Sequence, residues 1–128
     1  MSSYKRNKKL LIKLLGSVSL PPEFNDKERK MQLKGFLPKN FNVHHIIPKC
    51  MNGKDDIENL SIIQVDYHEM LHDGLTHILK AQAKLTKEDM SFMECYAKKY
   101  GAYTLNDVKE IKPSLRIKHR KQLQKLGL

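Results

Sequence analysis

The chain has 128 residues, of which 40% are hydrophobic and 30% are charged. This length and composition predict a single small globular domain with a modest core, and they exclude a largely disordered chain. No apolar run reaches the ~18 residues that a membrane span requires, and Lys13 interrupts the leucine-rich stretch near the N-terminus. We therefore expect neither a membrane segment nor a secretory signal. Cys50 and Cys95 form no CxxC pair, which excludes a cysteine-based zinc knuckle.

The basic residues are concentrated at the two ends of the chain. The formal net charge is +10, and an excess of this size in a small protein favours an anionic partner, with nucleic acid as the first candidate. Residues 5–13 and residues 112–125 are rich in Lys and Arg and contain no acid. The alternative is that both ends are flexible, solvated tails. In the C-terminal run, four side chains are expected to contact the phosphate backbone of duplex DNA: Arg116, Lys118, Arg120 and Lys121.

The expected elements are several helices and two short strands. The helix over 66–82 has few charged residues, so we expect much of it to be buried. Asn52-Gly53 can adopt positive φ in a turn between the strands. Periodicity, capping residues and turn residues predict, in chain order, a helix over 4–15 with a one-sided leucine face, a short helix within 23–35, strands over 41–47 and 59–65, a helix over 66–82 with Asp66 as its N-cap, a helix over 86–100, a short helix capped by Thr104, and a basic helix over 113–126.

Four histidines fall within 29 residues of the chain. His68 and His72 have i,i+4 spacing on a predicted helix, which places both imidazoles on one face and suits two ligands of one metal ion. A third ligand must come from elsewhere, and the predicted strand that carries His44 and His45 is the obvious source. Adjacent strand residues point to opposite faces, so one of this pair can bind the metal while the other faces a substrate.

Each part of this pattern is weak on its own. An HxxxH pair is more often incidental than metal-binding, and a lone Asn or Pro is an ordinary turn residue. The joint pattern is far more specific, because the stretch Val43–His72 resembles the ββα-metal core of HNH endonucleases. That family has a metal-binding residue, a His base, a Pro three residues later, a Gly-containing turn, an Asn-Leu pair and a His nine residues after the Asn. The matching positions here are His44, His45, Pro48, Asn52-Gly53, Asn59-Leu60 and His68.

The resemblance implies an α+β fold in which a ββα-metal core carries flanking helices. It implies a phosphodiester hydrolase that acts on DNA, with His45 as the general base that activates water. The additional His72 is similar to the subgroup that contains the colicin nuclease domains, where three histidines hold one metal ion. By that likeness, the metal ligands here are His44, His68 and His72.

Two further site residues and the metal follow from the same resemblance. Asn59 is expected to hold the two strands and the base loop in register, and Lys49 either contacts a phosphate or is a solvated turn lysine. Three imidazoles favour Zn²⁺, Ni²⁺ or Co²⁺ over Mg²⁺ on affinity grounds. Some HNH enzymes work with Mg²⁺ or Mn²⁺, so the bound ion and the activating ion can differ. Colicin-type sites often have an acid two residues before the first motif His, where this chain has Asn42.

The expected organisation is a basic helical extension over 1–40, the HNH core over 41–82 and a C-terminal helical extension over 83–128. The leading function is a DNA endonuclease of a phage or mobile element, placed in the cytoplasm of a bacterial or phage-infected cell. One alternative is a non-catalytic, zinc-stabilised nucleic-acid-binding module, and another is a toxin nuclease domain neutralised by an immunity protein. The oligomeric state, the preference for DNA or RNA and the sequence specificity do not follow from these patterns.

Overall fold

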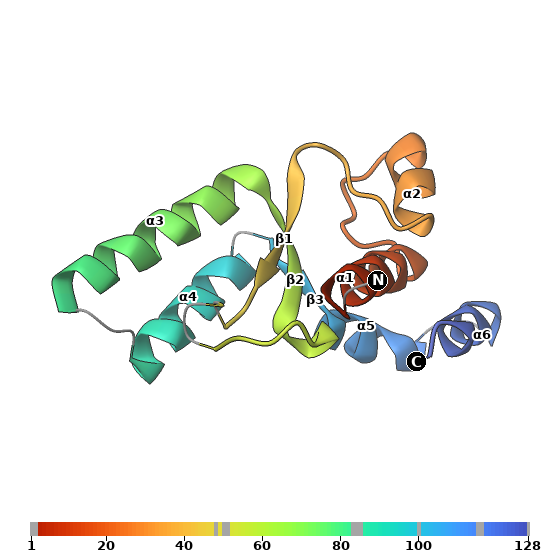
Figure 1. The fold of residues 1–128 in the computed structure, drawn as a ribbon. Coiled ribbons are helices and arrows are strands. Elements are labelled where there is room, and N and C mark those ends of the chain that lie inside the picture. The colour runs from red at the N-terminus through yellow and green to blue at the C-terminus, as the bar shows by residue number, and fades with distance from the viewer. Residues whose placement is uncertain are drawn as a thin grey trace.

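The computed structural model describes residues 3–47, 49, 52–82, 86–99, 101–114 and 117–127. Within them the chain forms helices and one antiparallel sheet, so the expected α+β class is confirmed (Figure 1). In chain order the elements are α1 (Ser3–Ser17), α2 (Asp26–Leu33), β1 (Phe41–His45), a 3-10 turn (Ile57–Asn59), β2 (Leu60–Gln64), α3 (Val65–Gln82), α4 (Lys87–Lys99), β3 (Tyr103–Thr104), α5 (Leu105–Ile111), a second 3-10 turn (Lys112–Ser114) and α6 (Ile117–Lys125). Among the described residues, no helix is both long enough and apolar enough to cross a membrane.

The sheet has the strand order β1-β2-β3, and the pairing of β1 with β2 forms the hairpin that carries the motif. His44 lies opposite Ser61 and His45 lies opposite Leu60. The first strand ends at His45 and does not continue to Ile47 as expected. The side chain of Asn59 causes this, because it bonds to the backbone N–H and C=O of Ile47 in place of a strand partner. The short third strand, β3, was not predicted from the sequence.

Helix α1 lies at the centre of the hydrophobic core. Its residues Leu11, Ile12, Leu14 and Leu15 are all at most 2% exposed, which confirms the predicted leucine face. The helix packs against α2, α5, α6 and β2, so both ends of the chain contribute to one core. The other buried members of that cluster are Phe24, Phe41, Val43, Leu60, Ile62, Leu105, Val108 and Leu123.

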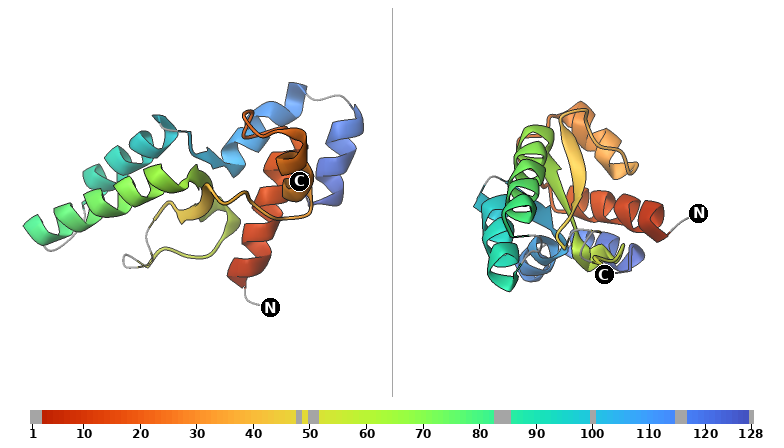
Figure 2. Two further views of the ribbon diagram at one scale, coloured as in Figure 1. Left: turned by 90° about the horizontal axis from the view of Figure 1, so that it is seen from above. Right: turned by 60° about the vertical axis from the view of Figure 1, so that its left-hand side comes forward.

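Helix α3 is much less buried than its low charge predicted. Leu71 and Leu75 are buried, whereas Met70 is 51% exposed and Asp73 is also exposed. The reason is visible in Figures 1 and 2, where α3 and α4 lie side by side and extend away from the sheet. Only the first half of α3 therefore lies against the hairpin.

Local signals placed most helix ends correctly. Asn25 and Glu28 form a capping box at the start of α2, and Thr86 and Asp89 bond reciprocally before α4. Thr104 precedes α5, as predicted, and its backbone N–H donates to Asp107. Two expectations were wrong: α3 begins at Val65, so Asp66 lies in its first turn and not at its N-cap, and α6 begins at Ile117, because a 3-10 turn occupies 112–114.

Candidate metal centre

Three histidines from two elements meet beside the end of β1. His44 comes from β1, and His68 and His72 come from successive turns of α3. One potential ligand atom from each ring lies within 4.8 Å of the others. The Nε2 atoms of His68 and His72 are 2.8 Å apart, and the ring of His44 lies edge-on to both. The structure thus brings together the three residues that the sequence marked as metal ligands.

The surroundings of these rings suit a metal ion. His44 is only 7% exposed, and its Nδ1 is buried without a hydrogen-bond partner in the part of the chain that the structure describes. An unsatisfied buried polar atom is costly. Burial, followed by the neighbouring histidines His68 and His72, lowers the pKa of His44 to about 3. Burial, followed by His72, lowers the pKa of His68 to about 4. Both rings are therefore neutral at pH 7, which is the state that binds a metal.

His45 lies on the other face of β1, as strand alternation predicted. Its Nε2 is 2.9 Å from Oδ1 of Asp55, and its ring stacks on that of Tyr4, with centroids 5.2 Å apart and planes 17° apart. The hydrogen bond to His45, and then the one from Lys49, lowers the pKa of Asp55. An ionised Asp55 only accepts, so Nε2 of His45 carries the proton and the lone pair of the neutral ring lies on Nδ1.

Two of these partners were missed in the sequence. At the position where colicin-type sites often carry an acid, this chain has Asn42, an exposed residue of β1, and the acid that meets His45 is Asp55 in the loop before β2. The sequence signal for it was no more than the Asp55-Asp56 pair within a turn. Tyr4 lies 41 positions before His45, and no local pattern connects the two residues.

Asn59 has the position expected of a residue that holds the hairpin in register. Its side-chain amide donates to the carbonyl oxygens of Ile47 and Lys54 at 3.1 and 2.8 Å, and its Oδ1 accepts from the N–H of Ile47 at 2.8 Å. Its backbone oxygen also accepts from Ile46. A single residue thereby joins the end of β1 to the loop that leads into β2. Asn7 of α1 adds a bond to the same loop, 2.9 Å from the backbone oxygen of Asp55.

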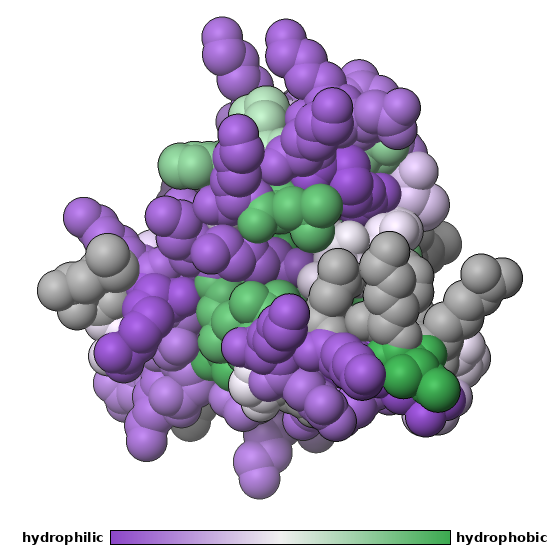
Figure 3. Space-filling view, turned by 90° about the vertical axis from the view of Figure 1, so that its right-hand side faces the viewer, coloured by the Kyte–Doolittle hydropathy of each residue, from purple (hydrophilic) through white to green (hydrophobic). Residues whose placement is uncertain are grey.

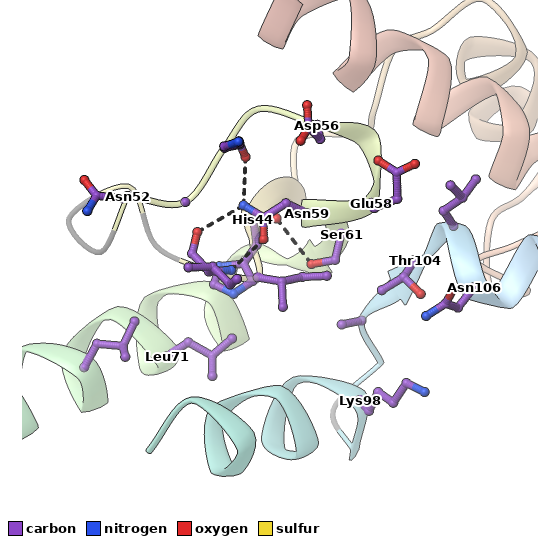
Figure 4. Close-up of a pocket in the computed structure, with 17 residues that line it drawn as sticks. His44, Asn52, Asp56, Glu58, Asn59, Ser61, Leu71, Lys98, Thr104 and Asn106 are labelled. Carbon is purple, nitrogen blue, oxygen red and sulfur yellow. Dashed lines mark hydrogen bonds between the residues drawn. The ribbon is translucent and has the colours of Figure 1, made fainter. Parts of the chain in front are cut away.

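A hollow of about 530 Å³ lies next to His44, on the α3 side of the sheet. Figure 4 shows the lining residues His44, Asn59 and Ser61 of the hairpin, with Leu71 on α3 and Lys98 on α4 below them. Apolar side chains form much of its wall, so the hollow leaves the α3 side of the hairpin loosely filled.

The cations expected to contact phosphates lie in two separate regions of the structure. Lys49 is exposed but paired with Asp55, at 3.1 Å. Arg120 and Lys121 are exposed on α6, which packs on α1 and lies across the molecule from α3 (Figures 1 and 2). Arg116 and the side chain of Lys118 fall outside the described residues. Figure 3 shows the face over α2, α6 and the start of α1, where hydrophilic side chains surround small hydrophobic patches.

Comparison with known proteins agrees with this geometry. Residues 27–74 match the sequence model of HNH endonucleases, a range that includes all four clustered histidines, Asp55 and Asn59. Over 55 residues the chain is 38% identical to the probable mobile endonuclease E of Enterobacteria phage T4, covering 43% of this chain and 39% of that protein. Over 74 residues it is 34% identical to the uncharacterized protein YhhZ of Escherichia coli K12, covering 57% of this chain and 19% of that protein.

The chain spans less than two fifths of the length of either relative. No solved structure gives a significant match to the chain. The family match nevertheless covers the hairpin and the start of α3, where the histidines meet. Residues 27–74 of the chain are thus similar to HNH endonucleases.

Proposed function

We propose that the protein is a metal-dependent endonuclease that hydrolyses phosphodiester bonds of DNA. The observation that carries this proposal is that two adjacent histidines of β1 lie in different environments. His44 enters a three-histidine cluster, while His45 enters a hydrogen-bonded pair with Asp55. A purely structural metal site needs no second, oriented imidazole beside its ligand, so the arrangement favours catalysis over a zinc-stabilised binding module.

His44, His68 and His72 would hold one divalent ion. Their neutral imidazoles favour Zn²⁺, Ni²⁺ or Co²⁺, and Mg²⁺ or Mn²⁺ remain candidates for the activating ion. The orphaned Nδ1 of His44 and the short separation of the three rings support this assignment. When bound, the ion supplies a positive charge that stabilises the negative charge developing on the phosphate and its leaving oxygen.

His45 would act as the general base. Its Nδ1 lone pair accepts a proton from the attacking water, while Asp55 holds the ring by its Nε2–H and stabilises the imidazolium that forms. Tyr4 packs flat against the ring and limits its rotation. The attacking oxygen forms a bond to phosphorus as the bond to the 3′-oxygen breaks, and the departing 3′-oxygen takes a proton from solvent. By family analogy, the products carry 5′-phosphate and 3′-hydroxyl ends.

The remaining residues would position the reacting groups and the substrate. Asn59 fixes the base loop by its three side-chain hydrogen bonds. Lys49 would contact a phosphate next to the base, although its bond to Asp55 also keeps it in place. On α6, Arg120 and Lys121, together with Arg116 and Lys118, would bind the duplex backbone, in keeping with the net charge of +10.

The test is cleavage of supercoiled plasmid by the purified protein. We expect nicked or linear products with added divalent metal, none with EDTA, and recovery on adding metal back. The His45→Ala protein, purified in parallel, controls for contaminating nuclease. The same reactions on single-stranded DNA and on RNA define the substrate. The reactions are repeated with Zn²⁺, Ni²⁺, Co²⁺, Mg²⁺ and Mn²⁺. A protein that binds one equivalent of metal but cleaves none of these substrates with any of these ions would be a non-catalytic module.

A further inference from the structure

A second hollow, of about 490 Å³, lies between α1 and the segment 35–43. Its charged wall residues are all lysines: Lys5, Lys8 and Lys9 from α1 and Lys39 from the segment before β1. No acid lies among the described residues that line it. Its size falls in the range of ~300–1,000 Å³ that is usual for pockets that bind small ligands. Such a wall has the charge that a phosphate-bearing ligand requires.

Of the two aromatic residues that line this hollow, Phe41 is buried and Phe36 is exposed. The side chain of Phe36 is 56% exposed, and Nζ of Lys9 lies 5.2 Å from its ring centroid. Gly35 makes this contact possible: it has φ +94°, and a Cβ there would clash with Cγ of Lys9. The lysine stem therefore crosses the glycine and ends beside the ring. Exposed aromatic rings among lysines are the usual platform for an unpaired base.

The hollow is connected to the proposed general base along α1. Lys8 and Lys9 are neighbours on this helix, and Nζ of Lys8 lies 5.9 Å from the ring centroid of Tyr4. Tyr4 in turn stacks on His45. Lys9 and Lys8 thus lie between the ring of Phe36 and the rings of Tyr4 and His45, as expected of a path for a strand whose bases and phosphates both need partners.

We propose that this hollow binds an unpaired nucleotide of the DNA substrate, with its base stacked on Phe36 and its flanking phosphates on the lysines, so that the enzyme prefers DNA with a single-stranded segment beside the cleavage site. The inference rests on the proposed function. Contact with a duplex backbone alone would use the lysines but would leave an exposed aromatic ring without a ligand.

The test is equilibrium binding of labelled DNA to the full chain in EDTA, where no cleavage occurs. One probe is a blunt duplex and the other is the same duplex with a single-stranded arm. Phe36→Ala should weaken binding of the armed DNA by about 5- to 160-fold, the range for loss of one base stack, and should leave blunt-duplex binding unchanged. Phe36→Tyr should preserve both affinities. Phe92→Ala, which removes an exposed ring on α4, should change neither.

A second variant reports on the phosphates. Lys39→Gln should reduce the slope of log affinity against log salt by about 0.7 for the armed DNA, as expected for one phosphate neutralised on a single strand. Equal affinity of the wild type for both probes, or an equal loss on both with Phe36→Ala, would overturn the proposal. Because these measurements exclude metal, a protein that passes them but cuts no DNA refutes only the nuclease assignment, and a nuclease that fails them refutes only this binding site.

Discussion

Helices α1 and α3 pack against opposite faces of the same hairpin but have different roles. Helix α1 meets the face that carries Leu60 and Ile62, and it forms the densest part of the core. Helix α3 meets the face that carries His44 and Ser61, where a hollow remains. The hydrophobic stability therefore lies on one side of the sheet and the candidate metal ligands lie on the other. The candidate metal ligands thus lie outside the densest part of the hydrophobic core.

Mutation of the proposed base, His45, should give the largest effect. His45 lies on the α1 side of the hairpin but contributes little to the core, so its loss should affect cleavage and not stability. His45→Ala should lower the cleavage rate by about 10²–10⁴-fold, the usual contribution of a general base. Metal content, DNA affinity and thermal stability should stay near those of the wild type. Single-turnover cleavage, metal analysis and thermal unfolding check these properties. Unchanged cleavage would remove His45 from the mechanism.

Truncation of one leucine on each helix compares the two packing interfaces directly. Leu14→Ala on α1 should lower the free energy of unfolding by about 2–5 kcal/mol, as for other large-to-small changes in a close-packed core. Leu75→Ala on α3 should cost less, because Leu75 already borders the hollow and its side chain therefore has less dispersion energy to forfeit. Urea denaturation of the metal-free proteins gives both values. Equal losses would show that the α3 side is as well packed as the α1 side.

Metal should increase the free energy of unfolding through the histidines on the α3 side of the hairpin. At a free metal concentration of about 100 times Kd, binding adds about 2.7 kcal/mol to the free energy of unfolding. His72→Ala should abolish this increment, whereas His77→Ala, which truncates an exposed histidine further along α3, should retain it. Calorimetric titration and thermal unfolding with and without Zn²⁺ measure the effect. Full metal stabilisation of the His72→Ala protein would exclude His72 from the site.

The cations of α6 should give the smallest effect. Replacing Arg120 and Lys121 by Gln should reduce the salt slope of duplex binding by up to ~1.8, or ~0.9 for each phosphate that is no longer neutralised. The effect should be similar for all DNA sequences, because phosphates carry no sequence information. The matched control replaces Lys80 and Lys87, which are exposed near the far ends of α3 and α4. A salt slope of the α6 double variant equal to that of the wild type and of the control would mean that α6 does not touch DNA.

The parts of the site that could be predicted from the sequence depend on short-range geometry. The i,i+4 spacing places His68 and His72 on one helix face in any fold, and alternation separates His44 from His45 on any strand. The same local logic identified the caps at Thr86 and Thr104.

The remaining features depend on contacts between segments that are distant in sequence. Tyr4 reaches His45 only because α1 packs beneath the hairpin. The burial of α3 was overestimated because low charge indicates that a helix can be buried, but does not show that another element covers it. The early end of β1 results from a side chain, that of Asn59, which competes with strand pairing.

The packing of α1 against both α5 and α6 has a consequence for the order in which this protein becomes functional. During translation α1 leaves the ribosome before the hairpin, whereas Val108 and Leu123, which complete the cluster around it, leave after the clustered histidines. The core around α1 therefore closes only after α5 and α6 have been synthesised. Because Tyr4 and Asn7 of the same helix contact His45 and its loop, a chain truncated before α5 should carry all its clustered histidines without holding His45 in place.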